Sequence, residues 1–199
     1  MKDLIVTIHQ PEHFPYEGFF KKMEMSDIFV ILDSVKFKKN NFQNRNRLVN
    51  NQGKEEWFGF PVPKKSNSMI INEVVACDES VNPWRKKLLK NLKYNLDIEA
   101  DRFYNHETLI EINMSGINWV RDQLKINTPI VYSSQLAAAG AKTDLLVEIC
   151  KELGASEYIS GNGGREYLDL EMFKSEDIKV SFFQSKVSNY YSMLYNLSK

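Results

Sequence analysis

Two histidines, His9 and His13, lie four residues apart just after an apolar stretch near the N-terminus. A histidine side chain can hydrogen-bond a phosphate or transfer a proton near neutral pH. The alternative is structural, with His9 capping a turn and His13 exposed. A metal site is disfavoured, because Pro11 stands between the two histidines and does not fit the helix that a His-x-x-x-His pair requires. The sequence predicts His9 or His13 as an acid or base.

Two further polar segments follow apolar, strand-like stretches. Asp33 comes after 28–32 and can hold a ribose, a sugar hydroxyl or Mg²⁺, or merely cap a turn. The second segment is glycine-rich, and glycines after a buried strand let backbone N–H groups approach a phosphate or sugar closely. Its spacing matches neither a P-loop nor a dinucleotide fingerprint. Its predicted substrate contacts are Ser160, Gly161, Asn162 and Gly163.

A basic segment, 44–47, reads Asn-Arg-Asn-Arg. Guanidinium groups bind phosphate or carboxylate through paired donors, and amides can read sugar hydroxyls. Two alternatives are a solvated charge run and, because Phe37 and Phe42 alternate with lysines, a single-stranded nucleic-acid surface. Equal numbers of basic and acidic residues, 26 each, count against nucleic acid. We therefore interpret Asn44, Arg45 and Arg47 as substrate-binding residues.

The elements that must position these residues alternate between strand and helix. An apolar strand at 4–8, a helix opened by Pro15 and a second apolar strand at 28–32 form a βαβ unit, whose strands are normally parallel. The last third repeats the alternation, with strands predicted at 130–132, 158–160 and 179–183 and a helix at 143–153. This pattern predicts an α/β fold with a mostly parallel sheet flanked by helices.

In open parallel sheets, ligands bind beyond the carboxyl ends of the strands. Four polar segments follow predicted strands: 9–15, Asp33, Ser133-Ser134 and 161–164. If the strands are parallel, these segments share one edge of the sheet. The sequence thus predicts a site built from several loops at that edge.

The middle of the chain interrupts the pattern. Residues 38–56 read as an ordered loop or irregular hairpin, and 57–60 and 69–75 as strands of a small β excursion. Helices are expected from Asn82-Pro83 onward and within 107–124. We predict a single domain, 1–199, in which 57–125 can form an inserted β and helical subregion between the two α/β parts.

Composition narrows the class of protein. Hydrophobic residues make up 43% and charged residues 26% of the 199 residues, as in globular proteins. The apolar run at 4–8 is too short for a signal peptide and no later run could span a membrane, so a cytoplasmic location without membrane attachment is expected. The two cysteines, Cys77 and Cys150, have no metal-type spacing. The three tryptophans are expected in the core.

A resemblance extends over most of the chain. The matching N-terminal residues include His9-Gln10-Pro11, Gly18, Lys21 or Lys22 and Asn44-Arg45, and the later ones are Tyr158 to Gly161 and Tyr167-Leu168. This pattern resembles the WbqC-like proteins, a bacterial family encoded in O-antigen and related polysaccharide gene clusters. The chain departs from it at Tyr16, where tryptophan is expected, and after Phe183. The resemblance implies a cytoplasmic role in building a surface glycan.

Together with this resemblance, the residues favour a transferase of O-antigen or capsular polysaccharide biosynthesis. We expect it to move an acyl or aminoacyl group from a donor to the amino group of a nucleotide-linked amino sugar. The catalytic residues would be His9, His13 and Asp33, with His9 or His13 deprotonating the attacking amine or steadying the developing charge. Lys21 could assist, and Gln10 and Pro11 would contact the substrate. The pyrophosphate would be held by Asn44, Arg45 and Gly161 to Gly164. No serine or cysteine stands out as a nucleophile, so direct transfer is favoured.

Three alternatives remain open at this point. The first is a non-catalytic module that binds a nucleotide sugar. The second is an ATP-dependent nucleotidyl or adenylyl transferase, because the order of strand, histidine turn, helix and aspartate is similar to proteins with a His-x-Gly-His element, whose glycine this chain lacks. Mg²⁺ and ATP are the cofactors that these hypotheses allow. The third is the nucleic-acid binder, which the neutral net charge disfavours.

Overall fold

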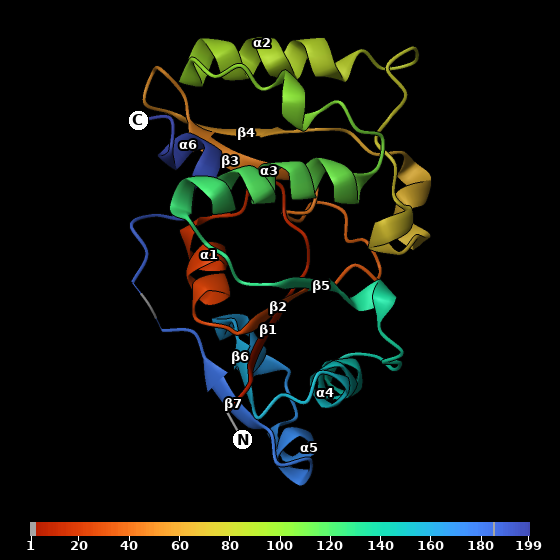
Figure 1. Ribbon diagram of the computed structural model, residues 1–199. Coiled ribbons are helices and arrows are strands. Elements are labelled where there is room, and N and C mark those ends of the chain that lie inside the picture. Colours follow the sequence, from red (N-terminus) through yellow and green to blue (C-terminus); the bar gives the residue numbers. More distant parts are fainter. Residues whose placement is uncertain (1–2, 185) are drawn as a thin grey trace. The chain divides into compact units, whose positions relative to one another are not determined.

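A computed structural model describes residues 3–184 and 186–199 of the chain (Figure 1). The chain forms two compact units. Unit 1 consists of Met1–Gln10, Gly18–Leu32 and Ile126–Lys186, and unit 2 of Pro11–Glu17, Asp33–Lys125 and Val187–Lys199. The inserted region that we predicted at 57–125 lies within the second segment of unit 2, which starts earlier, at Asp33.

Unit 1 is built on a parallel sheet of five strands, in the order β5-β2-β1-β6-β7 (Figure 1). The predicted α/β fold with a parallel sheet is therefore confirmed. The apolar, β-branched strand β1 is central, as expected for a strand covered on both faces. The chain moves from β1 outward to β5 and then returns to the other side of β1, so the strand order reverses between β1 and β6. The strands are β1 (Ile5–His9), β2 (Ile28–Ile31), β5 (Ile130–Tyr132), β6 (Glu157–Ser160) and β7 (Lys179–Phe182).

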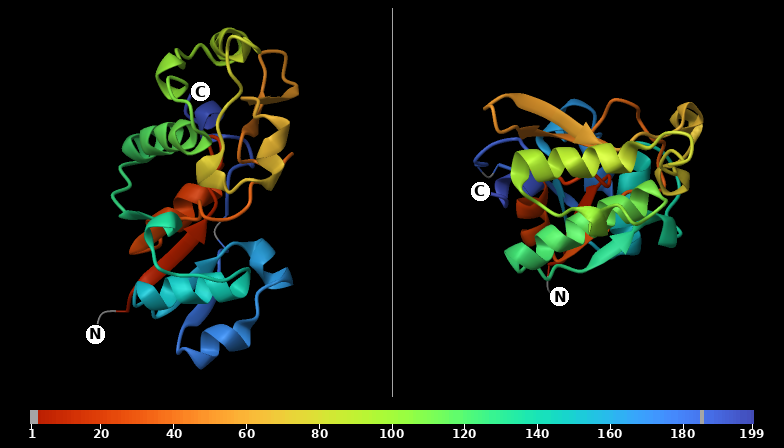
Figure 2. Two further views of the ribbon diagram at one scale, coloured as in Figure 1. Left: turned by 90° about the vertical axis from the view of Figure 1, so that its right-hand side faces the viewer. Right: turned by 90° about the horizontal axis from the view of Figure 1, so that it is seen from above.

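Three helices accompany this sheet: α1 (Glu17–Glu24), α4 (Thr143–Glu152) and α5 (Leu170–Ser175). Helix α1 buries Phe19, Phe20 and Met23 on one side, as their helical spacing predicts. Helix α4 ends before Gly154, which takes the left-handed conformation (φ 69°) that stops helices. Helices α4 and α5 lie side by side (Figures 1 and 2).

Unit 2 combines an antiparallel hairpin with helices. Its strands are β3 (Arg45–Val49) and β4 (Glu55–Gly59), and its helices are α2 (Trp84–Leu96), α3 (Leu109–Leu124) and α6 (Met193–Asn196). Helix α3 starts with a reciprocal capping box between Thr108 and Glu111. One hydrophobic core joins these elements, and it includes residues from both ends of the unit, such as Phe14 and Leu194.

Several local predictions for unit 2 need correction. The irregular hairpin expected within 38–56 is real, but its second strand extends to Gly59. The strand predicted at 69–75 is wrong. Ile71–Glu73 form a 3-10 helix, and the residues on either side make only isolated bridges, Ile70 with Lys36 and Val75 with Thr108. The helix expected from Asn82-Pro83 onward, α2, starts at Trp84, with Pro83 as its N-cap and no side-chain cap.

A helix that crosses a bilayer needs about 20 mostly apolar residues. Within 3–184 and 186–199, no helix is both long and apolar enough to cross a membrane.

Candidate functional site

The carboxyl ends of β1 and β6 meet where the strand order of unit 1 reverses. Strand β1 pairs with β6 in a register that joins Ile5 to Glu157 and Thr7 to Ile159. Continued by two residues, this register brings His9 opposite Gly161. Ligands of open parallel sheets bind at such reversal points, because the loops there diverge and leave a crevice. Two of the predicted site segments, the one that begins at His9 and the one that begins at Gly161, therefore share the carboxyl edge of the unit 1 sheet.

His9 ends β1 in a partly buried position against Phe19, with the two ring centroids 4.9 Å apart. Its Nδ1 lies 3.0 Å from the carbonyl oxygen of Gln10, which can only accept, so we assign the proton to Nδ1. The pKa of His9 is lowered to about 3, first by burial and then by the positive charge of Lys22. At neutral pH the imidazole is uncharged, and its Nε2 carries a lone pair.

Lys22 was named from the sequence only as an alternative to Lys21 in the family resemblance and was not predicted as a site residue, although it lies at the same edge. Its side chain is only 2% exposed, and it shares the buried side of α1 with Phe19. A Cβ atom added to Gly161 would lie 3.6 Å from the Lys22 Nζ, so the amine adjoins the glycine-rich loop. Its position three residues after Phe19, inside the apolar pattern of the helix, is the signal that could have revealed it.

Lys21, the lysine that we did predict, has a different role. Its Nζ donates to the carbonyl oxygen of Lys186 at 2.6 Å, at an exposed position. The neighbouring Lys22 is the lysine whose charge acts on His9. Successive residues of a helix point in directions about 100° apart, so the adjacent Lys21 and Lys22 face different surroundings.

The glycine-rich loop after β6 forms a 3-10 helix over Asn162–Glu166. A Cβ atom on Gly164 would run into the Ser160 hydroxyl, whereas one on Gly163 would meet nothing within 4 Å. Gly164 is thus required by packing, and Gly163 is sterically unconstrained. Asn162 and Gly163 are exposed, and Ser160 is buried with its hydroxyl 3.1 Å from the carbonyl oxygen of Gly161.

His13 lies in the core of unit 2 and has no exposed surface. Its Nε2 is 3.0 Å from the hydroxyl of Tyr104, and its Nδ1 is 3.3 Å from the Oδ1 of Asn113. The Asn113 amide donates to the carbonyl oxygens of Pro11 and Gln43, which fixes its oxygen toward His13. We therefore place the His13 proton on Nδ1, with Tyr104 donating to Nε2. Our structural alternative, in which His13 was exposed, is wrong.

Burial lowers the pKa of His13 to about 3, and the bond to Asn113 offsets this only in part. The ring is surrounded by aromatic side chains, with Phe58 and Phe60 at centroid distances of 5.3 and 5.2 Å. A catalytic role for His13 would require a substrate to reach a side chain without exposed surface. Its bonding is that of a histidine that organises a core.

Asp33 follows β2 and belongs to unit 2, where it is 3% exposed. Its carbonyl oxygen accepts a hydrogen bond from the backbone N–H of Asn72 at 3.1 Å. Pro11 is also in unit 2, whereas Gln10 is the last residue of the first segment of unit 1. The predicted four-loop site is therefore divided between the two units.

The basic segment 44–47 lies on the hairpin of unit 2. The Arg45 guanidinium stacks over the ring of Trp57 at 4.3 Å from its centroid, and Arg47 pairs with Glu55 at 3.3 Å. The Asn44 amide donates to the carbonyl oxygen of Phe60 at 2.8 Å. Trp57 is 45% exposed, so the prediction that all three tryptophans are core residues is wrong for this one. It serves as a platform for Arg45.

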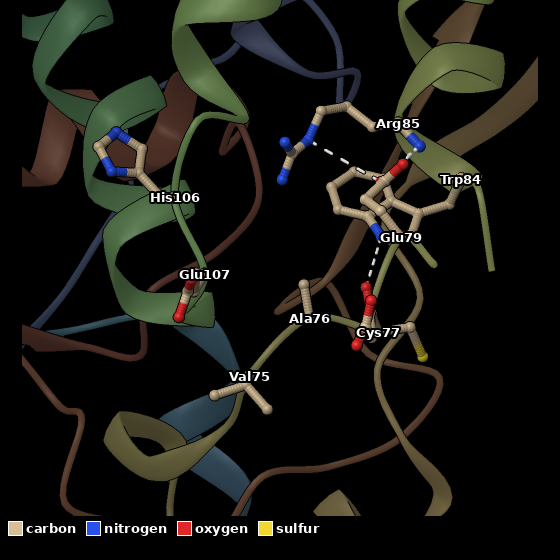
Figure 3. A pocket seen from close by; sticks show the side chains of 9 residues that line it. Val75, Ala76, Cys77, Glu79, Trp84, Arg85, His106 and Glu107 are labelled. Atoms are coloured by element: carbon tan, nitrogen blue, oxygen red, sulfur yellow. Dashed lines mark hydrogen bonds and ion pairs between the residues drawn. The ribbon is translucent and has the colours of Figure 1, made fainter. Parts of the chain in front are cut away.

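Unit 2 also contains a hollow of about 410 Å³ between the segment 75–79 and the start of α2. In it the Trp84 Nε1–H donates to the carbonyl oxygen of Cys77 at 2.8 Å (Figure 3). Figure 3 shows the thiol of Cys77 and the imidazole of His106 on opposite sides of this hollow. Burial raises the pKa of Cys77, which disfavours the thiolate. The hollow therefore lacks an activated thiol.

Acidic, histidine and cysteine side chains are the usual protein ligands of metal ions. In the described part of the chain, no group of three or more of them could hold a metal ion.

Comparisons with known proteins bear on the family. The model of the WbqC-like protein family matches residues 10–196. A relative in Mycobacterium tuberculosis, the uncharacterized protein Rv1507c, is 28% identical over 191 residues, which cover 89% of this chain and 81% of that protein. No solved structure matches the chain.

Proposed function

The chain belongs to the WbqC-like protein family, and from this premise we propose that it is a transferase acting on a nucleotide-linked amino sugar in the synthesis of a surface polysaccharide. The reaction that we propose is acyl or aminoacyl transfer to the sugar amino group. Its site is the carboxyl edge of the unit 1 sheet, where His9, Lys22 and the loop at Gly161 adjoin.

One observation carries this proposal: a buried lysine adjoins an uncharged histidine at the reversal point of the sheet. Lys22 is 2% exposed, and its charge lowers the pKa of His9. Such an arrangement at a ligand-binding edge is typical of functional sites, because it prepares a field for a negatively charged group.

These residues would divide the chemistry as follows. The sugar amine attacks the acyl carbon, the new C–N bond forms, and the carbonyl electrons move onto oxygen. The Lys22 ammonium stabilises this oxyanion, and the Nε2 of His9 takes the proton that the amine loses. When the tetrahedral intermediate collapses, the bond to the donor breaks and His9 returns the proton to the leaving group.

A pKa of about 3 makes free His9 a weak base. An anionic substrate beside Lys22 would offset the lysine charge and add a negative charge near the ring. Both changes favour the imidazolium, so substrate binding raises the pKa of His9 toward neutrality. The base is thereby strengthened only when the substrate is present.

Histidine NMR on variants of Lys22 tests this coupling. We expect Lys22→Met to raise the pKa of His9 above its value of about 3, since it removes one of the two causes that lower it. Lys21→Met is the matched control, because it removes an adjacent lysine whose amine binds the Lys186 carbonyl. An unchanged His9 pKa in Lys22→Met would refute the pairing.

The reaction itself is tested by screening nucleotide-linked amino sugars with acyl and aminoacyl donors and detecting products by mass spectrometry. We expect a product with the wild type and Lys21→Met, and at least a hundred-fold loss of rate in His9→Gln, the low end of typical general-base contributions. Saturable binding of the sugar nucleotide without any product would favour the binding-module alternative. Release of pyrophosphate from ATP would favour the nucleotidyl transferase.

A further inference from the structure

A second hollow of unit 2 has an unusual charge. It encloses about 190 Å³ at the open end of the hairpin, where the loop before β3 and the loop after β4 meet. Three of its residues are cations, Lys39, Arg45 and Lys64, and none is acidic. The whole chain has a formal net charge of zero, so this concentration of positive charge is local.

The cations of this hollow are not neutralised by carboxylates. Within the described residues, neither Arg45 nor the two lysines, Lys39 and Lys64, form an ion pair with an aspartate or glutamate. Three amide side chains belong to the same lining, those of Asn40, Asn44 and Asn67, of which the Asn44 amide already donates one hydrogen bond to the carbonyl oxygen of Phe60. The site therefore offers many donors and three positive charges to a small volume.

Arg45 is held in place before any ligand arrives. Its guanidinium stacks on Trp57 and donates through Nη2 to the carbonyl oxygen of Asn40 at 2.9 Å. Gly59 lies opposite Arg45 in the hairpin, and a Cβ atom there would be 2.6 Å from the Arg45 Cα. The glycine thus permits the close approach that sets the arginine. A preorganised guanidinium loses less entropy when it binds an oxyanion.

From this geometry we infer that the hollow binds the phosphoryl group of a small organic molecule. A phosphoryl group carries up to two negative charges and three acceptor oxygens, whereas a carboxylate has one charge and two oxygens. The three cations and three amides of the hollow match the charge and the acceptor oxygens of a phosphoryl group better than those of a carboxylate. The remaining wall is apolar, with Phe37 and the Pro61 to Pro63 segment, and can take the adjoining organic part.

The size of the hollow supports a compact group. Drug-sized ligands occupy pockets of about 300–1,000 Å³, which is larger than this one. The inference is independent of the chemistry proposed at His9 and Lys22, because every residue of the hollow belongs to unit 2.

Calorimetric titration with inorganic phosphate, pyrophosphate and acetate tests the site. We expect saturable binding of both phosphates, tighter for pyrophosphate, and much weaker binding of acetate. Arg45→Gln should weaken phosphate binding about ten-fold and Lys39→Gln or Lys64→Gln about three-fold each, as the exposure of the lysines limits their contribution.

Each of the two lysine variants has a matched control at a neighbouring lysine in the sequence. Lys38→Gln and Lys65→Gln remove exposed lysines adjacent in sequence that do not line the hollow, and should leave the affinity unchanged. Since Arg45→Gln could disturb the hairpin, the double variant Lys39→Gln/Lys64→Gln provides an independent result, with an expected loss of about ten-fold.

The inference would be overturned by no binding of either phosphate, by equal binding of acetate, or by equal losses in the control and lining variants. Affinity only for oligonucleotides, falling steeply with salt, would also overturn it. Lys22→Met separates this site from the proposed catalytic one. Loss of phosphate binding in that variant, with Lys39→Gln/Lys64→Gln unaffected, would place the anion at unit 1.

Discussion

At the scale of single residues, the two histidines differ in how their surroundings keep them uncharged. Both have a pKa lowered to about 3, and burial is the largest cause for each. For His9 the second cause is the charge of Lys22, which a ligand can offset. The His13 ring instead forms hydrogen bonds with the side chains of Tyr104 and Asn113, which form part of the core. If an anionic substrate binds beside Lys22 as we propose, His9 is therefore the one of these two histidines whose pKa would respond.

The lowered pKa of His13 predicts a loss of stability in acid. In the unfolded chain His13 has its ordinary pKa of 6.5, whereas in the folded protein its pKa is about 3. Between these two pH values the unfolded state therefore binds a proton at His13 that the folded state does not bind. The contribution is fully present above pH 6.5 and falls as the pH drops through this window. Between pH 6.5 and 4.5, the free energy of unfolding should fall about 2 kcal/mol more in the wild type than in His13→Gln.

Urea unfolding followed by circular dichroism at several pH values measures this difference. The comparison of slopes removes the contribution of His9, which is present in both proteins. An identical pH dependence of the two proteins would show that His13 is not held uncharged in the folded state.

At the scale of elements, the junction of β6 with the following 3-10 helix positions the glycine-rich loop. The buried Ser160 ends β6, and its hydroxyl occupies the place that a side chain at Gly164 would need. The glycine content of this loop therefore has two causes. Gly164 permits close packing, while the unobstructed Gly163 leaves the exposed backbone accessible.

Alanine substitutions of these two glycines should separate the causes. Gly164→Ala should lower the free energy of unfolding by about 1–3 kcal/mol, because its Cβ atom would crowd the Ser160 hydroxyl and lie 2.9 Å from the Leu168 Cδ1. Gly163→Ala should change it by less than about 0.5 kcal/mol. Thermal and urea unfolding measure both.

The double variant Ser160→Ala/Gly164→Ala provides the control. Removing the hydroxyl should recover part of the lost stability, since the crowding atom is gone. A cost in Gly163→Ala as large as that in Gly164→Ala would contradict the assigned contacts.

At the scale of the whole molecule, each unit is assembled from segments that are distant in sequence. The core of unit 2 contains Phe14 from its first segment and Leu194 from its last, besides many residues of 33–125. A unit assembled in this way depends on the C-terminal segment for its stability.

Truncation of Leu194 tests this dependence. The side chain has no exposed surface, so Leu194→Ala should cost about 2–5 kcal/mol of unfolding free energy. Leu197→Ala, in the same terminal segment but only partly buried, should cost less. Hydrogen exchange should show weaker protection in β3 and α3 of the first variant. Unchanged protection there would mean that the C-terminal segment is dispensable for the core.

The sequence by itself determined the elements of the parallel sheet. Continuous apolar, β-branched stretches produced β1 and β2. The long connection between them contains a helix, and such crossover connections normally join parallel strands, as they do here. It also determined that His9 and Gly161 share an edge, since both follow strands of that sheet. These features depend on patterns within a few neighbouring residues or on general rules for how consecutive strands are connected.

Only the tertiary structure decided which polar side chains are buried and by what. His13 is buried by Tyr104 and Asn113, which lie 91 and 100 residues further along the chain. The charge that acts on His9 comes from Lys22 and not from Lys21, because the rotation of α1 against the sheet selects it. Burial depends on residues far away in sequence, and local patterns do not record them. For the same reason, the division of the predicted site between two units became visible only in three dimensions.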